Sequence, residues 1–294
     1  MIAGLLLAAT ALGAADSAAP PLREAVVTAS VENLYSAPDE AKDVVSQATL
    51  GEVVQVLESA ASFARVRTPD RYSGWIPLRA IAEYRDGSEP RYARAGKAVE
   101  VTSLVANIYR EPSVTSARPT ALAPLAARLE LQDAAAPSGW VAVRLPTGEA
   151  GYIQEGDVKA VDPAAPRARG SGDEVVATAR RYLGTPYLWG GMTAHGIDCS
   201  GLVSRSYHAN GVELLRDADL QFADPNADPV AREALLPGDL VFFGRDAKSI
   251  SHVGLYVGGE RFISATTHQV PSVHEDRLDD PYWSAIYQGA RRPR

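Results

Sequence analysis

A single cysteine carries the strongest chemical signal in this sequence of 294 residues. Cys199 follows a glycine-rich loop and Asp198, and it precedes an apolar pattern of helical spacing at Leu202, Val203 and Tyr207. The pattern places Cys199 at or near a helix N-terminus, where the partial positive charge favours the thiolate and lowers the thiol pKa. Such a cysteine suits nucleophilic catalysis, which also needs a base, and histidine is the usual one.

The sequence contains five histidines in different contexts. They are His195, His208, His252, His268 and His274. His252 begins an apolar segment, 252–257, that follows a strand-like segment at 240–243 and leads through a Gly-Gly turn into a third at 261–264. A helix that presents a cysteine to a histidine on an adjacent sheet is the arrangement of papain-like enzymes. We therefore predict that His252 is the base. His195 is expected in a loop, and His208 and His274 on the solvated surface.

The part of the chain that holds these residues is predicted to start with a helix. Ser171 and Glu174 have the spacing of a capping box, in which both side chains satisfy free backbone N–H groups at a helix start. The helix is predicted to end at Gly184 and Pro186. Apolar residues share one face of it, namely Val175, Val176, Ala179, Tyr182 and Leu183.

Two segments of the N-terminal half resemble each other. Each opens with Asn-Leu-Tyr or Asn-Ile-Tyr and has a proline three positions later, at 33–38 and 107–112. Each closes on a glycine followed by an aromatic residue, at 74–75 and 151–152. Short alternating strands with Gly, Pro and Asp turns, repeated over about 60–70 residues, indicate two copies of one small β-barrel module. Both copies resemble bacterial SH3-like domains. For the second copy, a role as a passive spacer stays open.

Over residues 174–292 the sequence resembles the NlpC-type cell-wall cysteine peptidases, in the subgroup with N-terminal bacterial SH3-like domains. An ordered set of motifs carries the resemblance: YLGTPYLWGG, DCSGLV, LLRDADLQ, LLPGDLVFFG, SHVGLYVG, RFISA, and DDPYW followed by GARR. The resemblance implies an α+β chain, with a papain-like cysteine peptidase domain preceded by two small SH3-like β-barrels. It also implies cleavage of peptidoglycan stem peptides between γ-D-glutamate and a diamino acid, either meso-diaminopimelate or lysine.

The same resemblance assigns roles around the nucleophile Cys199 and the base His252. Tyr187 matches a tyrosine beside the nucleophile, where its hydroxyl and the N–H of Cys199 would stabilise an oxyanion. Asp198 matches an acidic residue that helps bind the free amine of a terminal L-Ala, and a carboxylate is a sensible partner for that charge. Ser200, next to the nucleophile, is also expected to bind substrate.

Further candidates lie outside this core of the motif. Tyr72, in the first repeat, matches a tyrosine that reaches into the active site of the subgroup. Trp189 is a candidate substrate contact, although a large aromatic ring in a glycine-rich bend more often fills space. Arg216, Asp217 and Gln221 match a stretch of the family, and an exposed loop ion pair is the alternative interpretation for them.

The sequence departs from the family at the residue that orients the base. Twelve positions after His252 the family most often has a histidine, whereas this chain has Ser264. A hydroxyl can accept a hydrogen bond from the ring nitrogen that does not face the thiol, and such a bond fixes the tautomer. His268 is the alternative third residue, because Ser264, Thr266 and His268 share one face if the strand continues unbroken.

Composition excludes several classes of protein. Lys and Arg number 29 against 36 Asp and Glu, a formal net charge of −7, so the basic excess of a nucleic-acid binder is missing. One cysteine excludes an intramolecular disulfide and a Cys-rich zinc site, and the histidines lack ligand spacing, so we expect no metal and no cofactor. No apolar run reaches the length of a transmembrane helix, so no membrane anchor of that kind is expected.

The apolar segment 2–15 has the length of a signal-peptide core. We therefore predict export to the periplasm or cell envelope, with a cytoplasmic protein that carries a disordered Ala-rich arm as the alternative. The predicted organisation is a signal peptide or arm at 1–22, SH3-like domains at 23–85 and 98–161, a linker at 162–172, and the catalytic domain at 173–294.

The predicted function is a cysteine endopeptidase that cuts the γ-D-glutamyl–diamino acid bond of muropeptides in cell-wall turnover or recycling, preferring those with a free N-terminal L-Ala. Two alternatives stay open. One is a catalytically degenerate peptidoglycan-binding protein, favoured only by Ser264. The other is an amidase or acyltransferase on the same scaffold.

Overall fold

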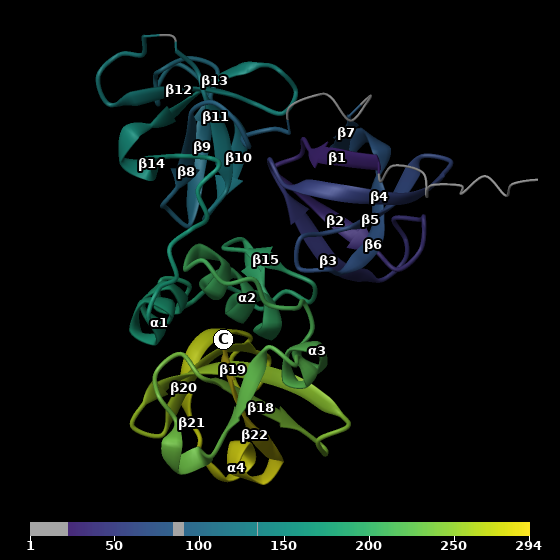
Figure 1. Cartoon of the computed structure of the whole chain (residues 1–294), viewed down its shortest axis with the longest axis vertical. Helices are drawn as coiled ribbons and strands as arrows, with labels where there is room; N and C mark the ends of the chain where they lie inside the picture. The colour runs from purple at the N-terminus through teal and green to yellow at the C-terminus, as the bar shows by residue number, and fades with distance from the viewer. Residues whose placement is uncertain (1–22, 85–90, 134) are drawn as a thin grey trace, which may run out of the picture.

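The computed structural model describes residues 23–84, 91–133 and 135–294, so the predicted signal peptide at 1–22 lies outside the described residues. Figure 1 shows two strand-rich parts, coloured purple to blue and blue to teal, and a green-to-yellow part that contains the helices. None of the helices in the described ranges is long and apolar enough to cross a membrane.

The first strand-rich part is one antiparallel sheet with the strand order β3-β2-β6-β5-β4-β1-β7. As predicted, apolar residues alternate with polar ones, and one face buries a core that includes Leu34, Val54 and Ile76. No pairing among the described residues joins β3 to β7, so the predicted barrel is not closed. The edge strand β3 packs instead on the C-terminal part, where Gln47 Oε1 accepts the N–H of Met192 at 3.0 Å. The strands are β1 Arg23–Val27, β2 Val31–Tyr35, β3 Val44–Thr49, β4 Val53–Ala60, β5 Phe63–Arg67, β6 Ser73–Pro77 and β7 Ile81–Glu83.

The second strand-rich part repeats this arrangement. Its order, β10-β9-β13-β12-β11-β8-β14, is that of the first sheet with every strand number raised by seven. Its core includes Val99, Ile108 and Leu129, and its two end strands are again unpaired with each other within the described ranges. The strands are β8 Ala98–Val101, β9 Val105–Tyr109, β10 Pro119–Pro124, β11 Arg128–Leu131, β12 Trp140–Arg144, β13 Ala150–Gln154 and β14 Val158–Val161.

The segment predicted as a linker, 162–172, is held at several points. Arg167 donates from Nε to Glu100 at 2.7 Å and from Nη2 to the carbonyl of Ala126 at 2.6 Å. Gly170 donates its N–H to the carbonyl of Asn210 at 3.0 Å. The second sheet is therefore fastened to the C-terminal part by polar contacts, rather than joined to it by a free tether.

The C-terminal part starts with the predicted capping box, which is confirmed: Ser171 and Glu174 exchange hydrogen bonds at the start of α1. This helix ends at Arg180, earlier than predicted, because the N–H groups of Arg181, Tyr182 and Leu183 bond to carbonyls only two or three residues back. As a result Leu183 leaves the apolar face and is exposed. The helices are α1 Gly172–Arg180, α2 Cys199–Ala209, α3 Ala218–Ala223 and α4 Pro281–Ile286.

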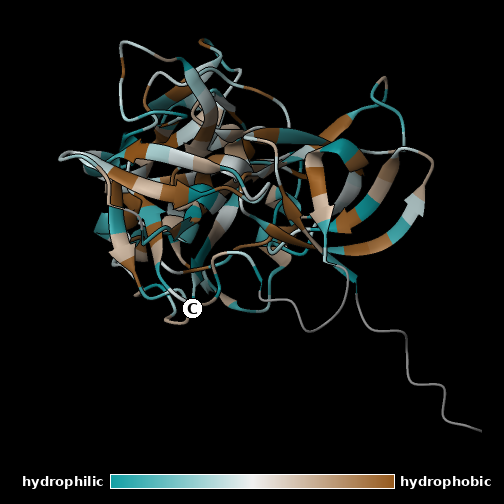
Figure 2. Ribbon diagram, turned by 90° about the horizontal axis from the view of Figure 1, so that it is seen from above, coloured by the Kyte–Doolittle hydropathy of each residue, from teal (hydrophilic) through white to brown (hydrophobic). Residues whose placement is uncertain are grey.

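A six-stranded sheet supports the helices, with the order β17-β22-β18-β19-β20-β21. Helix α2 packs its apolar side, including Leu202, on Val253 and Ile263 of the sheet, while the opposite face holds Phe243 and Trp283 beside α4 (Figure 1). Figure 2 shows hydrophobic segments lying mainly along strands. The strands of this part are β15 Met192–Thr193, β16 Gly196–Ile197, β17 Ala227–Val230, β18 Leu240–Gly244, β19 Ile250–Gly258, β20 Arg261–Thr266, β21 Ser272–Arg277 and β22 Tyr287–Pro293.

Candidate active site

Cys199 is the first residue of α2, as predicted. Asp198 is the N-cap, and its Oδ1 accepts the N–H of Gly201 at 2.7 Å. A Cβ at position 201 would clash with the carbonyl of Gly191, so a glycine is required there for the loop to lie against the helix. The glycine-rich loop and the cap together fix where the helix begins, and with it the position of the thiol.

The thiol itself is enclosed, since Cys199 is only 8% exposed. The backbone N–H groups of Val253 and Ser200 lie near the sulfur and act to lower the pKa of the thiol. Burial, followed by the negative charge of Asp198, nevertheless raises the pKa of the Cys199 thiol to about 12. The lowered thiol pKa that we expected at a helix N-terminus is therefore not found, because burial of the thiolate outweighs the effect of the two N–H groups.

His252 lies on β19, one residue before the Val253 N–H that contacts the sulfur. Its ring stacks on Trp283, with the ring centres 5.1 Å apart, and its Nε2 lies 3.0 Å from Ser264 Oγ. Burial, and then repulsion from His274, lower the pKa of His252 to about 3, so the ring is neutral at physiological pH.

No direct hydrogen bond joins the thiol to this ring in the part of the chain that the structure describes. Contacts between catalytic groups are often loose in the absence of substrate and tighten in the complex. The ring nitrogen Nδ1 of His252 is the one not used by Ser264, so it is the nitrogen that can serve Cys199. A neutral thiol beside a neutral imidazole has to transfer its proton as the sulfur attacks.

Of the two candidates for the third residue, the structure places only Ser264 at the base. Strand β20 ends at Thr266, so the unbroken strand that would align His268 with Ser264 does not form. The ring of His268 instead lies flat on Tyr282, with centroids 3.9 Å apart and an interplanar angle of 3°.

Tyr187 lies beside the nucleophile. Its backbone N–H bonds to the carbonyl of Pro271 at 3.0 Å, and it forms a bridge with Ile197, just before the N-cap of α2. Burial raises the pKa of Tyr187, and the charges of Cys199 and Asp198 raise it further, which places its hydroxyl within electrostatic reach of both. The hydroxyl therefore keeps its proton at neutral pH and can donate a hydrogen bond to an oxyanion.

Asp198 and Arg216 form a buried, bidentate ion pair. Arg216 donates from Nη1 to Oδ1 at 3.0 Å and from Nη2 to Oδ2 at 2.6 Å, and the N–H of Gly190 also donates to Oδ2 at 2.9 Å. Arg216 further donates to Ser200 Oγ at 2.8 Å and, from Nε, to Ser46 Oγ on β3 at 2.9 Å. The interpretation as an exposed loop ion pair was therefore wrong. This pair instead locks the N-terminus of α2 to the first sheet.

Tyr72 also comes from the first sheet, in the turn between β5 and β6. Its side chain lies near the carboxylate of Asp217, the neighbour of Arg216. Burial raises the pKa of Tyr72 to about 12, with Asp217 contributing. Sequence reasoning selected Tyr72 but left Asp217 undecided, and the family stretch LLRDADLQ was the signal that could have found it.

Two other candidates differ in accessibility. Trp189 is 69% exposed, so the interpretation that it fills space in the bend was wrong, and a substrate contact stays a prediction. Ser200 is buried against Asp198 and Arg216, so its hydroxyl supports the ion pair.

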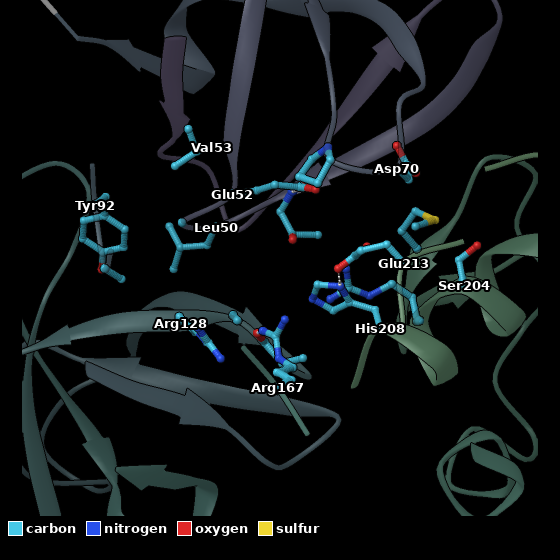
Figure 3. A pocket seen from close by; sticks show the side chains of 18 of the residues that line it. Leu50, Glu52, Val53, Asp70, Tyr92, Arg128, Arg167, Ser204, His208 and Glu213 are labelled. Atoms are coloured by element: carbon cyan, nitrogen blue, oxygen red, sulfur yellow. Dashed lines mark hydrogen bonds and ion pairs between the residues drawn. The ribbon is translucent and has the colours of Figure 1, made fainter. Parts of the chain in front are cut away.

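A separate cavity of about 180 Å³ lies where the two sheets meet α2, and neither Cys199 nor His252 lines it. Figure 3 shows Glu52 from the first sheet on one side, and Arg167 with the bonded pair His208 and Glu213 on the other. His208 was expected on the solvated surface, but it lines this cavity.

Comparison with known proteins identifies the family of this chain. Residues 184–292 match the model of the NlpC/P60 family, and residues 34–81 match the bacterial dipeptidyl-peptidase SH3 domain. Dipeptidyl-peptidase 6 of Lysinibacillus sphaericus is 30% identical over 82% of this chain and 87% of its own length. The chain belongs to the NlpC/P60 family. It is thus a cysteine peptidase that carries an N-terminal SH3 domain.

Two further proteins match this NlpC/P60 peptidase over most of its length. The gamma-D-glutamyl-L-lysine dipeptidyl-peptidase of Bacillus cereus is 28% identical over 86% of this chain and 76% of its own length. The crystal structure of an NlpC/P60 family protein from the same species superposes with a TM-score of 0.79, at 24% identity, over 92% of this chain and 99% of that one. This superposition shows that the chain has the same fold as that protein over most of its length.

Proposed function

We propose that this NlpC/P60 peptidase hydrolyses the γ-D-glutamyl–diamino acid bond of peptidoglycan stem peptides that carry a free N-terminal L-Ala. The diamino acid is meso-diaminopimelate or lysine, and the role is turnover or recycling of the cell wall. The observation that carries the proposal is that Tyr72 of the SH3 domain lies near Asp217, whose charge adds to burial in raising the pKa of Tyr72, beside the buried ion pair next to Cys199. The relatives named as γ-D-glutamyl-L-lysine dipeptidyl-peptidases support the choice of bond.

The proposed chemistry follows from the four groups at the nucleophile. His252 takes the proton of the Cys199 thiol as the sulfur attacks the γ-carbonyl carbon of D-glutamate. The N–H of Cys199 and the hydroxyl of Tyr187 hold the oxyanion. Collapse breaks the amide bond, the leaving amine takes the proton from His252, and water then hydrolyses the thioester.

For the amine of L-Ala, Asp217 is a better partner than Asp198. The oxygens of Asp198 already accept two bonds from Arg216 and others from backbone groups, so an ammonium group would have to displace a buried guanidinium. The carboxylate of Asp217 is only partly buried, lies near Tyr72 and caps no helix N–H. Burial raises the pKa of Asp217, and an ammonium partner would favour its ionised form.

The test compares L-Ala-γ-D-Glu-meso-diaminopimelate with the same peptide N-acetylated. We expect the free peptide to be cut at least about tenfold faster in kcat/KM, and Asp217→Asn to remove this preference by raising KM for the free peptide alone. Asp219→Asn is the matched control, because Asp219 lies exposed two residues further along. Equal cleavage of both peptides by the unmodified enzyme would overturn the proposed preference.

The structure bears on the alternatives as well. A degenerate binding protein was favoured only by Ser264, and Ser264 lies at hydrogen-bond distance from His252. Release of free diaminopimelate separates the proposed peptidase from an amidase or acyltransferase. We also propose that the second sheet is a second SH3-like module, supported by its repeated strand order, and that the protein is exported to the cell envelope, where its substrate would lie.

A further inference from the structure

The cavity where the two sheets meet α2 is lined by a buried arginine that has no carboxylate partner. Arg205, on α2, is 8% exposed, and its Nη2 donates to the carbonyl of Leu125 at 2.7 Å. Within the described ranges its guanidinium makes no other hydrogen bond and no ion pair. A guanidinium has several further N–H donors, and a buried charge is costly unless it is paired. This side of the cavity therefore suits a negatively charged group.

The first sheet presents the opposite charge to the same cavity, again without an ion pair. Glu52, just before β4, points toward the cavity (Figure 3). Its Oε2 accepts the N–H of Thr49 at 3.0 Å, and no cation lies at ion-pair distance from it in the part of the chain that the structure describes. Burial raises the pKa of Glu52 to about 7, and the charge of Arg205 opposes this rise. The two groups therefore act on each other through space without forming a pair.

Neighbouring charges on the wall of the cavity are engaged with each other or with nearby groups. Arg167 and Arg128 both donate to Glu100, from their Nε atoms at 2.7 and 3.0 Å. His208 and Glu213 are bonded to each other. These contacts leave the buried guanidinium of α2 and the carboxylate of the first sheet to a ligand.

The cavity has both the space and the opening that a small molecule needs. Its volume of about 180 Å³ equals the share of about six water molecules in the liquid, and alanine has about as many non-hydrogen atoms. Pro69, Arg94 and Glu213 line the cavity and are exposed, so it is open to solvent. Neither Cys199 nor His252 lines it, so a molecule bound here is separate from the nucleophile and the base.

We propose that this cavity binds a small α-amino acid, whose carboxylate pairs with Arg205 and whose ammonium group pairs with Glu52. Both charges of an α-amino acid are carried on one carbon atom and its neighbour, so a single molecule supplies the two missing partners. Hydrogen bonds between such charged groups are stronger than those between neutral ones. A simple anion would satisfy only the guanidinium and would be repelled by the carboxylate. The inference does not depend on the proposed cleavage of stem peptides.

Binding at this place has a consequence for the whole chain. The ligand would contact the first sheet through Glu52 and the peptidase part through Arg205, and the second sheet contributes Ala126 and Ala127 to the same wall. A ligand that binds only the folded state stabilises it in proportion to its occupancy. The amino acid would therefore hold the three parts together and raise the resistance of the chain to unfolding.

The test is thermal unfolding of the full chain at pH 8, where most of Glu52 is ionised, with about 10 mM L-alanine, propionate or ethylamine. L-Alanine should raise Tm by at least about 2 °C. Propionate lacks the ammonium group and ethylamine lacks the carboxylate, so each should give less than half of this shift. Titration calorimetry should show a single L-alanine bound per chain.

Variants separate this cavity from the active site. Glu52→Gln keeps the acceptor for Thr49 and should fold, yet it should lose the shift caused by L-alanine, as should Arg205→Met. Glu58→Gln is the matched control, because Glu58 is exposed on β4, and it should keep the shift. Asp217→Asn should also keep the shift, although it removes the proposed amine partner at the active site.

Three results would overturn the inference. The absence of any shift with L-alanine would mean that the cavity holds only water. An equal shift with propionate would mean a site for simple anions. A shift that is lost in Asp217→Asn but kept in Glu52→Gln would place the binding at the active site. Failure of the proposed function is recognised separately, because the unmodified enzyme would then not cut the tripeptide at all.

Discussion

Glu52 offers a quantitative test of how the SH3 domain is joined to the peptidase part. Its carboxylate lines the cavity of Figure 3 and accepts the N–H of Thr49 at 3.0 Å. Burial is the main reason that the pKa of Glu52 is raised from its ordinary 4.5 to about 7, with repulsion from Asp70 and Glu213 adding and Arg205 opposing. The folded protein therefore holds a proton that the unfolded chain releases at lower pH.

The direction of the pH dependence follows from linkage. A carboxyl whose pKa is raised by folding contributes stability that is complete below about pH 4.5 and is lost as the pH rises through about 7. The size of the shift corresponds to about 3 kcal/mol, with one pKa unit worth about 1.4 kcal/mol. Gln at position 52 keeps an acceptor for Thr49 without a charge, so Glu52→Gln should be as stable as the original protein near pH 4.5 and up to about 3 kcal/mol more stable at pH 8.

The assay is urea unfolding followed by tryptophan fluorescence at several pH values between 4.5 and 8. Glu58→Gln is the control, because Glu58 is exposed on β4 and its one ion pair within the described residues is with Arg65. Its difference from the original protein should stay small and flat with pH. If Glu52→Gln showed the same difference in unfolding free energy at pH 4.5 and pH 8, the burial of a protonated Glu52 would be refuted.

Three further outcomes follow from the site. Ser264→Ala should lower kcat about tenfold, because Nε2 of the base loses its acceptor, whereas His268→Ala should stay within about twofold; equal effects would contradict the assignment. The rate of Cys199 alkylation by iodoacetamide should be slow at neutral pH and still rise at pH 9, and a plateau below pH 8 would contradict the raised thiol pKa. Arg216→Met leaves Asp198 buried without its charged partner, and denaturant unfolding should show a loss of about 3–5 kcal/mol; a loss below about 1 kcal/mol would refute this role.

The parts of the fold that depend on local sequence could be predicted. The capping box of α1 and the position of Cys199 at the start of α2 need only a few neighbouring residues, so their patterns were sufficient. The alternating strands of the two repeats were also accessible from their pattern. The contact between His252 and Ser264, twelve residues apart on adjacent strands, was expected only from the resemblance to the family.

What could not be predicted depends on contacts between distant segments. Arg216 is buried because Ser46, 170 residues away, and Asp198 together satisfy its guanidinium. The raised pKa of the Cys199 thiol results from enclosure by the sheet, which outweighs the helix N-terminus that the sequence reveals.

The central claim is that the thiol of Cys199 attacks the γ-carbonyl of D-glutamate. The most direct measurement incubates the original enzyme and Cys199→Ala with L-Ala-γ-D-Glu-meso-diaminopimelate and identifies the products by mass spectrometry. The account predicts L-Ala-D-Glu and free diaminopimelate from the original enzyme, and intact tripeptide from the variant. Cleavage by Cys199→Ala at the original rate, or release of L-Ala from the original enzyme, would contradict it.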